Sequence, residues 1–185
     1  MNINALVKKI DYFYKLAATD LSQEIRRSLS EIFLVYLTSW SKQYYQQLQN
    51  ITAYIQHPDL IPELKKYTHL QAQVQLQLFV KINTTTKSYE GLSVNVASVP
   101  KIVGFNKNNN STSELSETLS LYIKDRIMAF IDPTMKAQMI EELSSKMEME
   151  GLIDRIKQEA ATIDTSPLPV SQLITLVIPV VINQG

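Results

Sequence analysis

The chain has 185 residues, of which 45% are hydrophobic and 19% charged, a composition typical of an ordinary folded protein. Its formal net charge is zero, so the total charge indicates neither a nucleic acid nor an acidic membrane as a partner. With no cysteine and only four glycines, the sequence excludes disulfides, thiolate metal sites and the glycine-rich phosphate loops of nucleotide-binding folds.

The charges are unevenly distributed along the chain. Residues 1–110 carry 12 Lys and Arg against 7 Asp and Glu, a balance of +5. Residues 111–185 carry 6 against 11, a balance of −5. The two halves can neutralise each other within one subunit, which is the interpretation we favour, or between subunits packed head to tail.

The first 56 residues have the apolar spacing of helices. Residues 3–17 predict an amphipathic helix of about four turns. Asp20 then has the chemistry of an N-cap, with Gln23 three residues on, as in a capping box. Residues 21–56 continue the helical spacing without Gly or Pro, which predicts a second helix roughly 50 Å long. We therefore expect a long N-terminal helical hairpin.

The segment HLQAQVQLQLFVKI alternates strictly between apolar and polar residues. The apolar positions are Leu70, Ala72, Val74, Leu76, Leu78, Val80 and Ile82, and the positions between them include Gln71, Gln73, Gln75 and Gln77. Period 2 predicts a strand, which at about 3.3 Å per residue is roughly 43 Å long and twice the usual length. LSVNVASV alternates in the same way and ends before Pro100, so we predict a β-hairpin of about 70–82 and 92–99. Because the second strand is shorter, we expect the first to have unpaired backbone that needs another partner.

The remaining residues predict a helical segment over 113–163 and then an extended arm. Ser111 and Ser113 with Glu114 have the chemistry of a helix start. Asp132 followed by Pro133 marks the next start, and Gly151 marks a break. Residues 168–185 are apolar and β-branched with a proline in the middle, which predicts a C-terminal strand at about 170–182 or an extended arm. The fold class is α+β, and we expect residues 1–185 to form a single domain.

The residue types that carry chemistry are sparse. The two histidines, His57 and His69, are too few for the common zinc sites. The close carboxylate pairs, Glu141 with Glu142 and Glu148 with Glu150, fit a solvated helix surface better than acid–base catalysis. The methionines at 135, 139 and 147 have the spacing of a buried helical stripe, the interpretation we favour over an adaptable binding groove. We therefore expect no catalytic residue, no cofactor, no metal and no small-molecule substrate.

The unprotected strand favours self-assembly. Gln pairs across strands without regard to charge, and an apolar arm can complete the sheet of a neighbour. The expected assembly surface consists of Gln71, Gln73, Gln75, Gln77, Leu173, Ile174, Leu176, Ile178, Val180 and Ile182. Such an architecture is similar to that of the structural subunits of tailed-phage virions, such as neck, connector or tail proteins. We therefore expect a non-enzymatic structural subunit that forms homo-oligomers through its sheet edge and C-terminal arm and contacts other structural proteins.

The alternative is a monomeric adaptor. The basic and aromatic residues of KKIDYFYK, or the methionine stripe, would then bind a partner protein, a membrane surface or a nucleic acid. Three isolated basic pairs in a chain of zero net charge are a weak signal for nucleic-acid binding, and the apolar face of the N-terminal helix is equally what core packing needs. Neither membrane nor nucleic acid is therefore an expected partner. The N-terminus has no apolar core run of a secretory signal, and no segment reaches the roughly 20 apolar residues of a membrane span, so we expect synthesis in the cytoplasm and, in the leading hypothesis, incorporation into a virion.

Overall fold

The computed structural model describes residues 3–55, 57–83, 85–161 and 169–182, with side chains described from Gln23 onward. Its elements are α1 (Ile3–Gln43), η1 (Tyr45–Gln49), α2 (Asn50–Ala53), η2 (Pro58–Leu60), α3 (Ile61–Leu64), β1 (Tyr67–Asn83), β2 (Ser88–Asn106), β3 (Thr112–Glu114), α4 (Glu117–Phe130), α5 (Pro133–Met149), α6 (Leu152–Ala160) and β4 (Val170–Pro179). The fold is α+β, as the sequence predicts. One antiparallel sheet has the strand order β3-β2-β1-β4.

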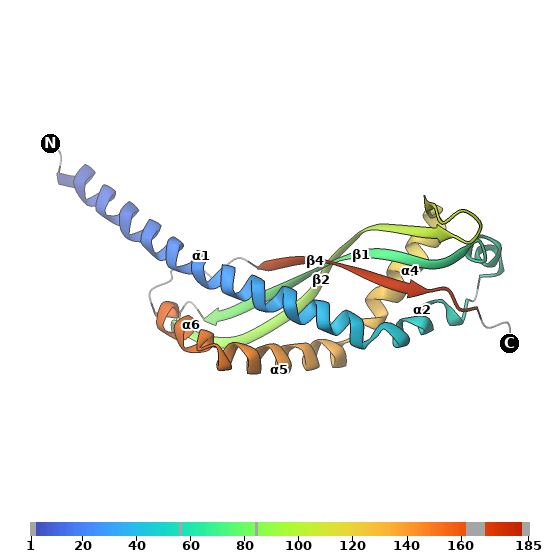
Figure 1. Cartoon of the computed structure of the whole chain (residues 1–185). Coiled ribbons are helices and arrows are strands. Elements are labelled where there is room, and N and C mark those ends of the chain that lie inside the picture. The colour runs from blue at the N-terminus through green and yellow to red at the C-terminus, as the bar shows by residue number, and fades with distance from the viewer. Residues whose placement is uncertain (1–2, 56, 84, 162–168, 183–185) are drawn as a thin grey trace.

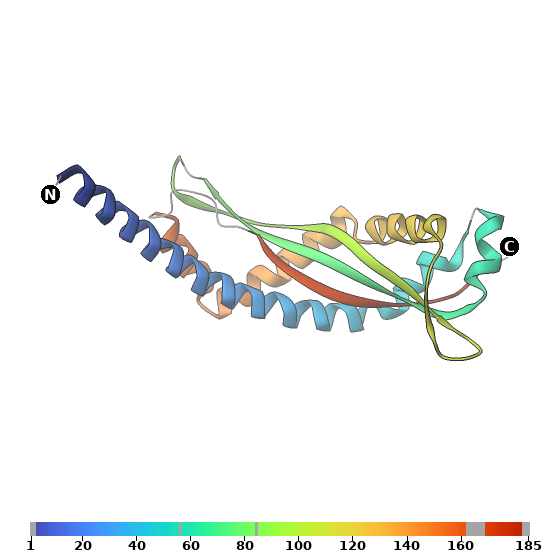
Figure 2. The same cartoon turned by 90° about the horizontal axis from the view of Figure 1, so that it is seen from above.

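The molecule has two layers. In Figure 1 the right-hand part of the twisted sheet lies above α1 and α5, while the left-hand ends of β1 and β2 pass behind α1 toward α6. Figure 2 shows β4, β1 and β2 side by side along the sheet. The apolar series of β1, from Leu70 to Ile82, is at most 8% exposed and faces this helical layer. Phe33 and Leu37 of α1 and Leu143 of α5 are fully buried against it, so the strictly alternating strand forms the centre of the core.

The N-terminal hairpin prediction was wrong, because α1 is one helix of 41 residues, roughly 60 Å long. The capping chemistry of Asp20 does not end a helix by itself. An interior Asp costs only a few tenths of a kcal/mol of helix propensity, and no Gly or Pro precedes it. The helix also ends earlier than predicted, at Gln43. The chain then turns through η1 and α2, which still bury the predicted apolar positions Leu48 and Ile51.

The second strand is longer than predicted, because β2 continues through Pro100 to Asn106 and pairs with the whole of β1. The register shifts between Gln73 and Leu76 of β1, where β2 carries extra residues around Pro100. A bulge leaves residues out of the ladder, so the missing N–H of proline is tolerated there. The expectation that β1 lacks a hairpin partner along part of its length was therefore wrong.

The C-terminal strand prediction is confirmed, and β4 pairs with β1 of the same chain from His69 to Leu78. Both edges of β1 are thus paired within one molecule over this range.

The helical segment begins later than predicted. Residues 112–114 form β3, and Ser116 is the N-cap of α4, because its hydroxyl accepts a hydrogen bond from Leu119 N at 3.3 Å. The start at Asp132 and the break at Gly151, with φ of 71°, are confirmed. The predicted end of this segment near residue 163 and the residues of the arm before 169 and after 182 lie outside the described residues.

Candidate assembly surfaces

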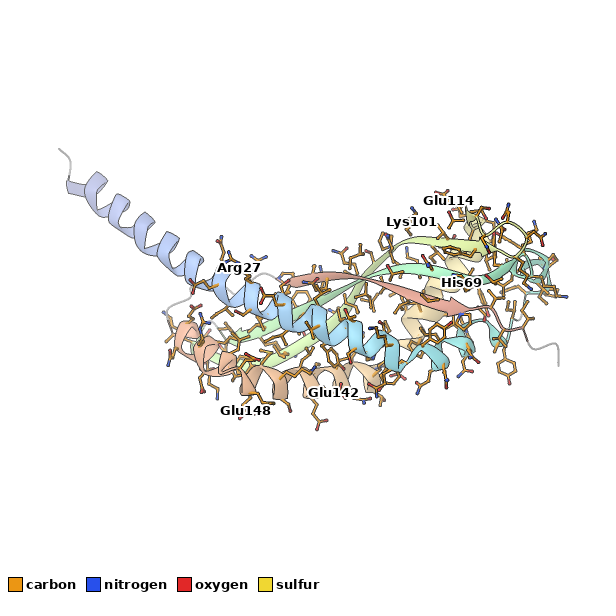
Figure 3. All side chains as sticks on the ribbon, in the orientation of Figure 1. Arg27, His69, Lys101, Glu114, Glu142 and Glu148 are labelled. Carbon is orange, nitrogen blue, oxygen red and sulfur yellow. The ribbon has the colours of Figure 1, made fainter. Side chains whose placement is uncertain are left out.

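The sheet has a second face, opposite the helical layer. The four glutamines of β1 lie on it, each half-buried between the neighbouring strands. The Ser98 hydroxyl of β2 donates a hydrogen bond to Gln75 Oε1 at 3.3 Å, which places Ser98 on the same face. In Figure 3, Lys101 and Glu114 lie above the sheet, whereas Glu142 and Glu148 lie on α5 below it. We call this surface the open face.

The open face carries little charge. Over the stretch in which β1 pairs with both neighbours, five positions from each strand lie on it. They are His69, Gln71, Gln73, Gln75 and Gln77 of β1, Asn95, Ser98, Lys101, Val103 and Phe105 of β2, and Ser171, Leu173, Thr175, Val177 and Pro179 of β4. With histidine counted as neutral, Lys101 is the single charged residue among these fifteen. Solvated sheet faces are usually polar and charged, whereas depletion of charge marks the centre of protein interfaces.

Aromatic and aliphatic side chains interrupt the amides of the open face. The His69 ring stacks on the Phe105 ring, with centroids 4.3 Å apart and planes 17° from parallel. Leu173 is 50% exposed on β4. The face therefore combines hydrogen-bonding amides with apolar contact points.

The structure separates the predicted C-terminal residues into three groups. Leu173 is on the open face with the four glutamines. Ile174, Leu176 and Ile178 point the other way and are at most 7% exposed in the core of the same chain, so they are not available to a neighbour. Val180 and Ile182 are partly buried against that core.

Thr52 holds the end of β4 in place. It is fully buried, its hydroxyl lies 3.1 Å from the carbonyl oxygen of Pro179, and it accepts a hydrogen bond from Val181 N at 3.0 Å. Val180 N also donates to the carbonyl oxygen of Thr68 at 3.3 Å, just beyond the paired residues of β1 and β4. These contacts attach the C-terminal segment to its own subunit.

The two edges of the sheet differ. The β2 edge is paired with β3 only at Val103–Phe105, and the rest of it carries Pro100 and Lys101, two features that discourage strand addition. The β4 edge has no charged residue between Val170 and Ile182, and α1 lies close to it, with the Gln172 side chain bonded to Ser30.

Sequence reasoning missed a groove between α1 and the turn from α5 to α6. It has a volume of about 550 Å³ and is lined by Ser28, Glu31, Ile32, Val35, Lys146, Met149, Glu150, Leu152 and Arg155. Val35 is 65% exposed and Met149 88% exposed, which is unusual for large apolar side chains. No local signal distinguishes these residues from a core stripe, because the groove forms only when distant helices meet.

A second hollow is basic. It has a volume of about 580 Å³ and is lined by Pro62, Lys65, Lys66, Asn106, Lys107, Asn108 and Asn109. Lys107 N donates to the carbonyl oxygen of Lys66 at 3.1 Å, which brings the α3 end and the asparagine loop together.

The candidate chemical residues do not converge. His57 packs edge-on against Tyr122, whereas His69 stacks on Phe105, so the two histidines have different aromatic partners. Within the described ranges, no three His, Asp or Glu side chains are grouped as metal ligands. Met139 and Met147 are fully buried, which confirms the core interpretation of the methionine stripe at those two positions. The side chains of KKIDYFYK lie outside the described residues.

One predicted surface carboxylate has a structural partner. The Tyr36 hydroxyl of α1 donates to Glu142 Oε2 of α5 at 2.5 Å, and burial, with this hydrogen bond, raises the pKa of Tyr36 above its ordinary value of 10.0. Glu142 is half-buried, in contrast to the exposed Glu141, Glu148 and Glu150. It therefore joins the two helices and is more than a solvating charge.

No family model, curated protein or solved structure matches the chain. Among the helices of the described residues, none combines the length and the apolar character needed to span a bilayer. Function must therefore be inferred from the surfaces of the molecule.

Proposed function

We propose that the chain is a non-enzymatic structural subunit that assembles with copies of itself through the open face of its sheet, including β4. The observation that carries the proposal is the near absence of charge across fifteen open-face positions, with Leu173 half-exposed among amides. The virion context suggested by the architecture belongs to the same proposal.

The mode of contact differs from the one expected from sequence. With β2 and β4 paired to β1 from His69 to Leu78, a neighbour cannot add a strand to β1 over this range, but it can pack on the open face. Ten residues at about 3.3 Å and three strands about 4.8 Å apart give roughly 450 Å² for this face. A standard interface buries about 800 Å² per partner, so a stable assembly needs a further contact.

The test is to place charge at the centre of the open face. Leu173→Lys, combined with Gln73→Lys, adds two like charges on neighbouring strands without touching the core. Sedimentation velocity over a concentration series should show a larger assembly for the parent and a shift to lower mass for the double variant. A matched control is Gln158→Lys on the exposed surface of α6, which should leave the mass distribution unchanged. A parent that stays monomeric at every concentration would refute the proposal.

A second candidate function rests on the basic hollow. Three lysines and three asparagines around one hollow suit the phosphate backbone of a nucleic acid. Binding of a single-stranded oligonucleotide, followed by fluorescence anisotropy, should weaken as salt rises and be lost in Lys66→Glu/Lys107→Glu. The matched control is Lys42→Glu, an exposed lysine at the end of α1. Equal binding by the double variant and the control would remove this candidate.

A further inference from the structure

Helix α1 is longer than the body it packs on. In Figures 1 and 2 its N-terminal part extends away from the sheet and from the other helices toward the N-terminus. We call residues 3–22 the N-terminal segment. The helix is uninterrupted from Ile3 to Gln43, so this segment cannot fold back onto its own subunit without breaking α1.

The sequence of the N-terminal segment has a stripe that continues into the groove. Apolar residues recur with alternating steps of four and three, which is the heptad spacing of helices that pack along their length. The stripe consists of Ile3, Val7, Ile10, Tyr14, Ala17 and Leu21. Steps of seven from Val7 lead through Tyr14 and Leu21 to Ser28 and Val35. The stripe and the α1 wall of the groove therefore follow one line of heptad positions, which drifts by about 20° per heptad on a straight helix and which a left-handed supercoil turns toward one partner.

The groove has the exposed apolar surface that an apolar helical stripe can cover. Val35 and Met149 present apolar surface to solvent, and Ile32 and the buried Leu152 form the wall and floor between them. The rim carries two acids, Glu31 and Glu150, and two bases, Lys146 and Arg155, so it has no net charge to repel a helix.

We infer that the groove receives the N-terminal segment of a second copy of the chain, with the two α1 helices antiparallel. A twofold axis at Leu21 places Val7 beside the second copy's Val35 and Tyr14 beside the second copy's Ser28, because these positions are equally spaced about residue 21. The large Tyr14 then meets the small Ser28, and Leu21 meets its own copy at the centre.

The area of this contact suits a stable dimer. From residue 3 to residue 39 the paired helices run for roughly 55 Å, and at a helix diameter of about 10 Å this corresponds to roughly 550 Å² per copy. The groove walls on α5 and α6 add to this, which brings the contact close to the standard size of about 800 Å² per partner. The dimer deepens the proposed function by supplying the further contact that the open face needs, and it does not depend on the open face.

Cysteine cross-linking tests the register directly, because the chain has no cysteine of its own. Leu21→Cys should form a covalent dimer under mild oxidation, since its two copies meet at the axis, while Gln158→Cys on exposed α6 should remain monomeric. Mixing Val7→Cys with Val35→Cys should give a mixed dimer faster than either variant gives one alone. Equal cross-linking of Leu21→Cys and Gln158→Cys at low protein concentration would overturn the inference.

A charge in the groove provides the second measurement. Val35→Asp should weaken dimerisation by more than tenfold in analytical ultracentrifugation, and its 65% exposure means that the fold itself should tolerate the change. Gln23→Asp, exposed on the same helix but not at a stripe position, is the matched control. A dimer that survives Val35→Asp but is lost with Leu173→Lys would overturn the groove contact and leave the open face intact. The opposite result would support the groove and remove the open face.

Discussion

Thr52→Val should loosen the attachment of the C-terminal segment without disturbing the core. The substitution has nearly the same shape, so it leaves no cavity, but it removes the hydroxyl that lies 3.1 Å from the Pro179 carbonyl and accepts from Val181 N. A buried hydrogen-bonding group left without its partner costs about 1–3 kcal/mol. Val181 is partly exposed, so water can replace part of the loss, and we expect a net cost of about 1–2 kcal/mol.

The assay is urea and thermal unfolding combined with amide hydrogen exchange. For a chain of this size, about 1–2 kcal/mol corresponds to a fall in Tm of about 2–8 °C. Exchange should accelerate at Val181 and leave the centre of β4 protected, because the β1–β4 ladder is intact. The control is Thr38→Val, which removes an exposed hydroxyl bonded within α1 and should change stability by less than about 0.5 kcal/mol. Unchanged stability with unchanged protection at Val181 would refute the role assigned to Thr52.

Three further substitutions test the packing, one helix cap and one partly buried carboxyl by urea unfolding. Gly104→Ala should cost about 1–3 kcal/mol, because a Cβ there would lie 2.4 Å from the Tyr67 ring, and the cost should shrink in a Tyr67→Leu background. Asp132→Ala should cost about 0.5–2 kcal/mol by removing the N-cap of α5. Burial raises the pKa of the Glu159 carboxyl above its ordinary 4.5, so its ionisation destabilises the fold as pH rises through the raised value. Glu159→Gln should therefore be more stable than the parent at neutral pH, and the difference should vanish below pH 4.5.

Each of the three substitutions has an outcome that would contradict its prediction. An equal cost of Gly104→Ala in both backgrounds would show that the Tyr67 ring is not the obstacle. No loss of stability in Asp132→Ala would show that the carboxylate adds nothing to the cap. A stability difference for Glu159→Gln that is the same at pH 4 and at pH 8 would exclude the carboxyl as its source.

The central strand β1 was predictable because its alternation of apolar and polar residues matches the alternation of buried and half-buried side chains. Each second side chain from Leu70 to Ile82 enters the core, so the pattern reports the environment residue by residue. The C-terminal strand was predictable from β-branched composition, but its partner was not. β1 and β4 are far apart in sequence, and several segments of the chain could have formed hydrogen bonds with the same edge of β1.

The errors arose where one local signal fits two structures. Asp20 can cap a helix or lie inside one, and the absence of Gly and Pro around it was the better guide. Pro100 can end a strand or occupy a bulge. The bulge is favoured here because β1 is long enough to pair with β2 on both sides of Pro100. The groove was hidden for a different reason, because Val35 and Met149 each fit an apolar helical stripe and only the assembled fold leaves them exposed.

The order of the strands affects how the protein is made. β1 ends at Asn83, whereas its partner β4 begins at Val170, so the ribosome must add the intervening residues before the sheet can be completed. At about 5–20 residues per second, this takes roughly 4 to 17 s. During that time the nascent chain presents one unpaired edge of a long, amide-rich strand, beside other nascent copies on the same messenger RNA. Binding of a chaperone to this strand during translation would protect it until β4 arrives.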